Sequence, residues 1–300
     1  MKKRLIVILG PTAVGKSAVA VRLAKKCNGE VVSADSRQVY KGLDIGTGKI
    51  TEKEMRGVPH YLLDVADSKK WFSVVEYQKL AREKIREIFS RGRVPIVCGG
   101  TGFYIQSIVD GIVLPEVPPN KALRTRLEKK TVMQLFVILK KLDTRRTKTI
   151  DRNNPRRLVR AIEIATALGK VPLYSNVPQN IGIELLNIGL NVPPEELKRR
   201  IHGRLAKRIS SGMVSEARQL HKNGLSWKRM NELGLEYRFL ALYLQKKISK
   251  EELREKLQAE IWQYAKRQMT WFKRDKRIMW FKPSQFSEIS TLAKKFLARD

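Results

Sequence analysis

Residues 10–17 constrain the fold most strongly, because they match the spacing G-x-x-x-x-G-K-[ST] of a phosphate-binding loop. An apolar run at 5–9 precedes them, and a helical pattern at 18–26 follows. Glycines let the backbone approach a phosphate, and N–H groups at the start of the helix face the anion. The loop consists of Gly10, Pro11, Thr12, Ala13, Val14, Gly15, Lys16 and Ser17. This context favours a diphosphate or triphosphate site over a chance glycine turn.

Two side chains carry the chemistry of this loop. Lys16 can reach the outer phosphate of a bound ligand, and the Ser17 hydroxyl can bind Mg²⁺. The motif specifies a polyphosphate, but it does not distinguish ATP from other diphosphates or triphosphates.

The chain is strongly basic. Its 300 residues include 61 Lys and Arg against 29 Asp and Glu, which gives a net charge of +32. A solvated surface with mixed charges would be nearer to balance. The excess predicts a polyanionic partner, with nucleic acid as the first candidate and an anionic membrane surface as the second.

No apolar run has the roughly 20 residues that a membrane span needs. The basic residues 1–4 are followed by an apolar run that is too short for a signal peptide. The two cysteines, Cys27 and Cys98, predict neither a disulfide framework nor a metal cluster, and the three histidines lack zinc-site spacing. These features predict a cytoplasmic protein.

Strand and helix patterns alternate over the first 112 residues. Strands are expected at 4–9, 30–33, 60–65 and 94–98, and helices at 16–27, 74–90 and 102–110. This order predicts an α/β fold with a P-loop NTPase-like parallel sheet and helices on both faces. Ligands of such sheets bind beyond the carboxyl ends of the strands.

Asp35 follows the second expected strand and should lie at the same sheet edge as Lys16. Its carboxylate could cap a helix, bind Mg²⁺ or act as a general base. Residues 99–102, which follow the strand at 94–98, are glycines and Thr101, where an ATPase would normally carry an acidic residue. This argues against ordinary NTP hydrolysis. The glycines indicate either close approach to a ligand or a tight turn before a helix.

The rest of the chain begins with a proline-rich stretch at 111–120. Helical patterns follow at 121–130, 132–141 and 156–168. These helices are densely basic, which favours RNA contact over a solvated face. A strand at 183–190 and a helix from Pro193 onward follow. A long helix at 250–271 ends in a basic and aromatic block that includes Trp262 and Trp271, which could stack on bases or pack in the core. A last strand is expected at 278–281 and a closing helix at 286–298.

Seven segments together resemble the tRNA dimethylallyltransferases, the IPP transferase family, and they occur in the family's order. These segments are residues 10–17, 33–40, 46–49, 59–64, 99–104, 156–163 and 264–271. The resemblance implies a helical tRNA-binding insertion domain at 116–178 within a P-loop catalytic core at 1–115 and 179–300. We expect Mg²⁺ to be needed, bound through Ser17, and we expect a monomer, since one chain supplies all the parts.

The resemblance implies the transfer of a dimethylallyl group from dimethylallyl diphosphate to N6 of the adenine immediately 3′ of the anticodon. The phosphate-binding loop would then hold the diphosphate of the allyl donor. Lys16 and Arg204 would stabilise the leaving diphosphate, and Asp35 would accept the proton of the attacking amine. Thr101 would contact the target nucleotide, which must leave the anticodon stack.

The resemblance also implies a set of tRNA contacts in the anticodon stem-loop. These contacts would come from Asp35, Ser36, Arg37, Gln38, Thr101, Arg124, Arg156, Arg157, Leu158, Val159 and Arg160. Arg156 stands where the family usually has Gln, and Ala206 where it commonly has an acidic residue.

Three other functions fit parts of the sequence. A small-molecule or nucleotide kinase would explain the phosphate-binding loop, but not the basic helices. A P-loop RNA-binding module without catalysis would bind tRNA without turnover. A prenyltransferase that acts on free adenine nucleotides would not need so basic a surface.

Overall fold

The computed structural model describes residues 3–112, 114–172 and 182–298. The chain forms two compact units, one from residues 1–111 and 179–300, and one from residues 112–178. We call them the core unit and the helical unit. The boundaries expected from the sequence were 116 and 178.

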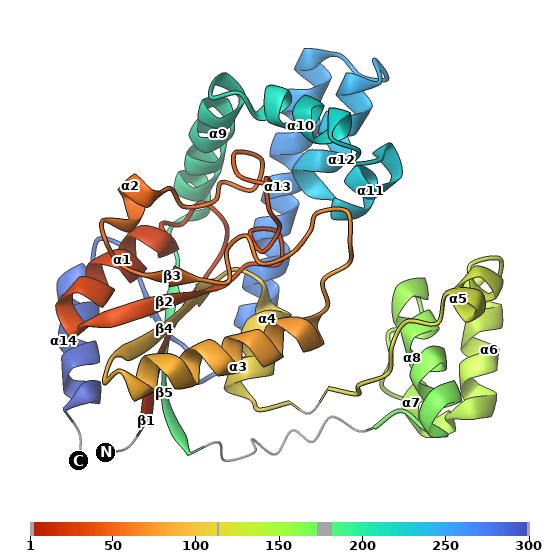
Figure 1. Cartoon of the computed structure of the whole chain (residues 1–300), viewed down its shortest axis with the longest axis horizontal. Helices are drawn as coiled ribbons and strands as arrows, with labels where there is room; N and C mark the ends of the chain where they lie inside the picture. Colours follow the sequence, from red (N-terminus) through yellow and green to blue (C-terminus); the bar gives the residue numbers. More distant parts are fainter. Residues whose placement is uncertain (1–2, 113, 173–181, 299–300) are drawn as a thin grey trace. The chain divides into compact units, whose positions relative to one another are not determined.

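The core unit contains a six-stranded parallel sheet with the strand order β3-β2-β4-β1-β5-β6 (Figure 1). The strands are β1 (Lys3–Leu9), β2 (Gly29–Ala34), β3 (His60–Tyr61), β4 (Val94–Gly99), β5 (Ile183–Leu190) and β6 (Met279–Phe281). β1 is central, and its residues 5–8 are completely buried, as expected for a strand covered on both faces. The predicted α/β class with a parallel sheet is therefore confirmed.

Helices cover both faces of the sheet. α1 (Lys16–Cys27) packs with α14 (Phe286–Leu297), and α3 (Val74–Ser90) packs with α4 (Gly102–Val109) (Figure 1). The β1-α1-β2 and β3-α3-β4 connections run in opposite directions along the sheet. Because such crossovers are right-handed, α1 and α3 lie on opposite faces. Because the strands are parallel, the loops that follow β1, β2 and β4 lie at the same edge of the sheet.

The remaining helices of the core unit follow β5, apart from α2 (Glu52–Met55). They are α9 (Pro194–Ser210), α10 (Met213–Lys222), α11 (Trp227–Leu233), α12 (Leu235–Leu244) and α13 (Lys250–Phe272). Gly212 has φ 98° and separates α9 from α10, because residues with a side chain seldom adopt that conformation. Ser249 and Glu252 form a capping box that begins α13.

The helical unit has its own small core. Its helices are α5 (Lys121–Leu127), α6 (Val132–Leu142), α7 (Thr144–Thr147) and α8 (Pro155–Leu168). Leu135, Leu139, Leu158 and Ile162 pack together, each at most 1% exposed. Asn120 caps α5, and Pro155 occupies the first turn of α8, where its missing N–H has no helical partner to lose.

Some predicted elements were wrong in extent. The strand predicted at 60–65 is only His60–Tyr61, because Leu62 and Asp64 have φ of 62° and 57° and turn the chain out of the sheet. The helix predicted at 121–130 ends at Leu127. The short helices α2, α7 and α11 were not predicted. Within the part of the chain that is described, no helix has the length and apolar character needed to cross a lipid bilayer.

Candidate functional site

The phosphate-binding loop joins β1 to α1. Gly10 has φ 145°, and a Cβ at this position would overlap the carbonyl oxygen of Leu190 in β5. Ala13 and Gly15 also have positive φ, at 63° and 106°. The Lys16 Nζ folds back and donates a hydrogen bond to the Pro11 carbonyl oxygen at 2.7 Å. The backbone has the curled form that presents N–H groups to an anion.

The Lys16 ammonium group loses its proton more readily than an ordinary lysine does. Burial lowers the pKa of Lys16 to about 8, and the Arg204 guanidinium also lowers it, while the Asp35 carboxylate opposes this shift. Burial raises the pKa of the Cys98 thiol to about 12, so Cys98 is neutral at physiological pH. An anion bound beside Lys16 would restore its full charge.

A cavity of about 340 Å³ opens beside the loop and the first turns of α1. Its lining residues include the following: Gly15, Lys16, Ser17, Arg22, Gly48, Glu54, Arg56 and Arg204. Four of these side chains are cationic and one is acidic, so the cavity favours an anionic ligand. Arg22 and Arg56 were not predicted, since neither belongs to a motif that marks a binding site.

Arg204 reaches the cavity from α9. Its Nη2 donates a hydrogen bond to the Gly48 carbonyl oxygen at 2.8 Å. Gly48 has φ 61°, and a methyl group in place of its hydrogen would overlap the guanidinium. Burial lowers the pKa of Arg204, and neighbouring Arg208 lowers it further, but arginine remains protonated. The structure therefore brings together Lys16, Ser17 and Arg204.

Asp35 lies at the end of β2, but it does not cap a helix. Its Oδ1 accepts hydrogen bonds from the N–H groups of Arg37, at 2.9 Å, and Gln38, at 3.4 Å, and residues 36–39 form a turn. The helix-cap interpretation was therefore wrong. The Asp35 carboxylate acts to raise the pKa of both Lys16 and Arg204, against the net shift, so its charge acts on both cations.

Thr101 follows β4 and faces the turn after Asp35. Its Oγ1 accepts a hydrogen bond from the Ser36 N–H at 3.0 Å and lies 3.3 Å from the Ser36 Oγ. The Tyr264 hydroxyl of α13 also hydrogen-bonds to Thr101. The ends of β2 and β4 and one face of α13 thus converge on Thr101.

The glycines around Thr101 are explained by the protein itself. A Cβ at Gly99 would overlap the backbone of Ala34, and one at Gly102 would overlap the Trp271 indole. A Cβ at Gly100 would overlap the Gln268 amide. These positions need glycine to allow close packing, and the interpretation as close approach to a ligand is not required.

Gln268 of α13 links two loops of the site. Its Oε1 accepts a hydrogen bond from the Thr12 N–H at 2.9 Å, and its Nε2 donates to the Gly100 carbonyl oxygen at 2.8 Å. The side chain is 6% exposed. Sequence reasoning missed the individual roles of Gln268 and Tyr264, although both lie in a segment that matched the family. The apolar positions Leu257, Ile261, Ala265 and Phe272 mark the buried face of α13, and Gln268 lies on it, but the sequence does not indicate which loops that face meets.

Both tryptophans of the basic and aromatic block pack partly against the core. Trp271 lies edge-to-face with Phe103, with ring centroids 6.5 Å apart. The Lys198 Nζ lies 5.3 Å from the centroid of the Trp262 ring. Packing against the core therefore covers a large part of each indole, which is one of the two roles expected for these tryptophans.

Four arginines of the helical unit were predicted to bind tRNA, and they fall into two groups. Arg124 forms a two-pronged ion pair with Glu163, at 2.7 and 2.8 Å, and Arg160 donates to Glu163 at 3.0 Å. Glu163 is 1% exposed and also accepts a hydrogen bond from the Asn120 N–H. Arg124 and Arg160 thus hold the helical unit together.

Arg156 and Arg157 are exposed on α8, and Arg157 makes one long ion pair with Asp151 at 3.8 Å. Val159 is half-buried. Leu158 is completely buried in the core of the helical unit, so its side chain offers no surface for a contact with tRNA. Apolar periodicity places Leu158 on the inner face of α8, where packing excludes a ligand.

Comparisons with known proteins agree with this geometry. Residues 38–275 match the model of a family described as IPP transferase. The chain is 43% identical to tRNA dimethylallyltransferase 1 of Syntrophus aciditrophicus, over 96% of this chain and 97% of that protein. It is 44% identical to tRNA dimethylallyltransferase 2 of Treponema denticola, over 91% and 92%.

Solved structures give the same result. The full-length tRNA isopentenylpyrophosphate transferase of Bacillus halodurans aligns with a TM-score of 0.74 and 36% identity, over 99% of this chain and 97% of that one. A eukaryotic dimethylallyltransferase described as acting on tRNA aligns with a TM-score of 0.84 and 26% identity, over 99% and 80%. The chain therefore belongs to the IPP transferase family, which includes the tRNA dimethylallyltransferases.

Proposed function

We propose that this protein transfers a dimethylallyl group from dimethylallyl diphosphate to N6 of the adenosine immediately 3′ of the anticodon in tRNA, with release of diphosphate. Family membership supports the transfer to tRNA. The observation that carries the proposal is the convergence of Lys16, Ser17 and Arg204 on one cavity, with Asp35 close by.

In this reaction the bond between the allyl carbon and the diphosphate oxygen breaks, and negative charge grows on the diphosphate. Backbone N–H groups of the loop, together with Lys16 and Arg204, would stabilise that charge. The two side chains come from different segments of the core unit, 1–111 and 179–300, and both lie partly shielded from water. Their charges therefore act more strongly on a bound anion than they would in water.

The attacking group is the exocyclic amine of adenine, whose lone pair is delocalised into the ring. As the new C–N bond forms, the amine must lose a proton, and the Asp35 carboxylate is the proposed acceptor. The turn at 36–39 fixes one carboxylate oxygen through the N–H groups of Arg37 and Gln38. The proposed role of Thr101 is to contact the target nucleotide beside this carboxylate.

The proposed metal is Mg²⁺, and the donor set of the cavity fits it. Ser17 offers a hydroxyl oxygen in the cavity, and Mg²⁺ prefers oxygen ligands, keeps several waters and commonly binds substrate phosphates. Over residues 3–112, 114–172 and 182–298, no cluster of three or more acidic, His or Cys side chains could hold a metal. Most ligands would therefore come from the diphosphate and water. Bound in this way, Mg²⁺ would neutralise charge on the leaving diphosphate.

The proposed tRNA partner explains the large basic excess. The contacts we assign to it are the anticodon stem-loop contacts of Asp35, Ser36, Arg37, Gln38 and Thr101, and the exposed Arg156 and Arg157. We also propose a monomer, since one chain supplies Lys16, Asp35 and Arg204, and a cytoplasmic location, where tRNA is available.

The proposal is tested by incubating the protein with unmodified tRNA, Mg²⁺ and dimethylallyl diphosphate labelled in the allyl group. Digestion to nucleosides should place the label on N6 of one adenosine, next to the anticodon. Binding of tRNA without any labelled nucleoside would favour a non-catalytic RNA-binding module. Label on AMP in a parallel reaction that contains AMP in place of tRNA, with no label on tRNA, would favour a prenyltransferase that acts on free adenine nucleotides.

A further inference from the structure

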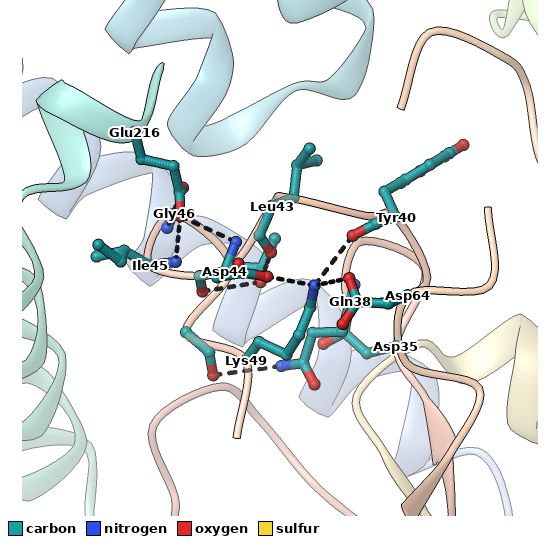
Figure 2. A network of polar contacts seen from close by, with 12 residues as sticks. Asp35, Gln38, Tyr40, Leu43, Asp44, Ile45, Gly46, Lys49, Asp64 and Glu216 are labelled. Carbon is teal, nitrogen blue, oxygen red and sulfur yellow. Dashed lines mark hydrogen bonds and ion pairs between the residues drawn. The ribbon is translucent and has the colours of Figure 1, made fainter. Parts of the chain in front are cut away.

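The Glu216 carboxylate of α10 binds the backbone of the loop at residues 44–48, which precedes α2. The Glu216 carboxylate accepts hydrogen bonds from three consecutive backbone N–H groups, those of Asp44 at 3.0 Å, Ile45 at 2.6 Å and Gly46 at 2.9 Å (Figure 2). Successive N–H groups that point to one centre form an anion-binding nest. Here the bound anion is a side chain from a position 170 residues away in the sequence.

Neighbouring groups hold Glu216 and the loop in place. The Tyr237 hydroxyl donates a hydrogen bond to Glu216 Oε1 at 2.8 Å. Tyr237 is 1% exposed, and a Cβ at Gly46 would lie 2.5 Å from its hydroxyl oxygen. The Gly46 carbonyl oxygen accepts a hydrogen bond from Arg208, which also pairs with Glu236 at 2.6 Å. The loop therefore has a single well-supported position beside α10 and α12.

The other end of the same loop faces the cavity. Gly48, two residues after Gly46, lines the cavity and accepts hydrogen bonds from Arg204 at 2.8 Å and from Gln38 Nε2 at 3.4 Å. The Lys49 Nζ donates hydrogen bonds to Asp44 within the loop and to Asp64 outside it, at 2.5 Å each (Figure 2). It also donates to the Tyr40 carbonyl oxygen at 3.0 Å, which ties the loop to the segment that follows the turn at 36–39. Glu216 thus binds the backbone at residues 44–46, and the same loop supplies, at Gly48, the carbonyl oxygen that accepts the hydrogen bond from Arg204.

We propose that Glu216 is a positioning residue for the transfer reaction, because its carboxylate fixes the loop whose Gly48 carbonyl orients the Arg204 guanidinium at the diphosphate cavity. The inference rests on the proposed function, in which Arg204 stabilises the leaving diphosphate. Glu216 does not line the cavity, and the hydrogen bond from Arg204 goes to Gly48. Its effect on the reaction is therefore indirect and passes through residues 44–48.

The charge of Glu216 is the important property. Hydrogen bonds to an ionised carboxylate are about twice as strong as neutral ones, and this carboxylate accepts four of them. The amide of glutamine keeps the size of the side chain, but it carries no charge and offers one oxygen fewer. With glutamine at 216, at least one loop N–H would lose its acceptor, and the Gly48 carbonyl would no longer hold one position.

The test compares Glu216→Gln with wild type, and with Glu255→Gln as the matched control, since Glu255 is an exposed glutamate of α13 outside the site. The measurements are kcat and KM for dimethylallyl diphosphate, Kd for inorganic diphosphate, Kd for tRNA and the unfolding midpoint. We expect kcat/KM for the donor and the affinity for diphosphate to fall about tenfold or more. The affinity for tRNA should stay within about twofold, and Glu255→Gln should match wild type.

A double-mutant cycle separates positioning from general stability. If Glu216 acts through Arg204, Glu216→Gln should change kcat/KM less than about threefold in an Arg204→Ala background. An effect of the same size in both backgrounds would overturn the inference. Tyr237→Phe provides a milder variant, because it removes only the hydroxyl that donates to Glu216, and a smaller fall in diphosphate affinity is expected.

The outcomes distinguish this inference from the proposed function. Wild-type protein that transfers no label to tRNA would contradict the proposed function, whereas the diphosphate Kd would still test Glu216. Full diphosphate affinity and full kcat/KM in Glu216→Gln would overturn the positioning role. If Glu216→Gln does not fold, unchanged diphosphate affinity in Tyr237→Phe would overturn it instead.

Discussion

Two cationic side chains of the candidate site, Lys16 and Arg204, have pKa values below their ordinary values because of where the fold places them. Burial lowers the pKa of Lys16 and of Arg204; Arg204 lowers the pKa of Lys16 further, and Arg208 lowers that of Arg204. Such an arrangement disfavours the empty, positively charged cavity and favours the cavity with a bound anion. At the residue scale, the site therefore favours a bound anion, which in the proposed function is diphosphate.

The pKa of about 8 for Lys16 predicts a pH dependence of diphosphate binding. Above pH 8 the free protein loses the Lys16 proton, while bound diphosphate stabilises the protonated form. Binding should then take up a proton, and the affinity should fall by up to about tenfold per pH unit. Below pH 8 this group should contribute no pH dependence. Calorimetry between pH 7 and pH 10 measures the change.

Lys16→Arg is the control for this prediction, because arginine stays charged over that range. The difference between the two profiles removes the titration of diphosphate itself. Parallel profiles for wild type and Lys16→Arg would show that Lys16 does not titrate near pH 8.

Asp35→Asn tests the proposed general base with little change in structure. Asparagine keeps an oxygen that can accept the Arg37 and Gln38 N–H groups, but it is too weak a base to take the amine proton. Turnover should fall about 10²–10⁴-fold, the range typical of a general base, with tRNA affinity nearly unchanged. Rapid-quench kinetics and a tRNA-binding titration measure the two quantities. Equal losses in both would rule out the role as base.

At the scale of elements, the sequence predicted the parts of the site that local pattern determines. The loop at 10–17 follows an apolar strand and begins a helix, so motif and periodicity agree there. Asp35 and Thr101 follow buried strands, and a parallel sheet brings such positions to one edge. These predictions needed no knowledge of how distant helices pack.

The missed parts depend on contacts between distant segments. Gln268 links the phosphate-binding loop to the loop after β4, and Glu216 binds the backbone of residues 44–46. A single Gln or Glu in an amphipathic helix gives no sign of its partner. For the same reason, the sequence suggested RNA contact for Arg124 and Arg160, whereas both bind the buried Glu163.

Glu163 should be important for the stability of the helical unit. Removal of its charge by Glu163→Gln leaves Arg124 and Arg160 without their carboxylate partner and should destabilise the unit by about 2–4 kcal/mol. Hydrogen exchange in α5 and α8 should then be faster, while the core unit stays protected. Glu116→Gln, at an exposed site, is the control.

The same network should weaken in acid. Burial raises the pKa of Glu163, but hydrogen bonds from Arg124 and Arg160 outweigh it and hold the pKa below its ordinary value of 4.5. The stabilisation should therefore be complete above about pH 4.5 and be lost as the pH falls through the lower folded value. Equal acid sensitivity of wild type and Glu163→Gln would contradict this account.

Arg156 and Arg157 should behave differently from Arg124. Each is exposed, so replacement by Ala should leave the unfolding midpoint unchanged. If each contacts a tRNA phosphate, the slope of log affinity against log salt should become shallower by about 0.7 to 0.9 for each arginine removed. An unchanged slope would mean that these side chains do not contact phosphate. Arg124→Ala should instead lower the unfolding midpoint.

At the scale of the whole molecule, two properties have to be explained together. The net charge of +32 predicts a large polyanion as partner, and the cavity of about 340 Å³ with four cationic side chains predicts a small one. A kinase accounts for the cavity but not for the charge, and an RNA-binding module accounts for the charge but not for the cavity. Transfer of an allyl group from a diphosphate to tRNA accounts for both.

The most direct measurement is a single-turnover reaction in which diphosphate and modified tRNA are counted together. Enzyme in excess over dimethylallyl diphosphate is mixed with unmodified tRNA and Mg²⁺, and a parallel reaction contains ATP in place of the donor. The account predicts one diphosphate released for each adenosine modified, at the same rate, and no change in ATP. Formation of ADP, or release of diphosphate without modified tRNA, would contradict the claim that the loop holds a leaving group during transfer to tRNA.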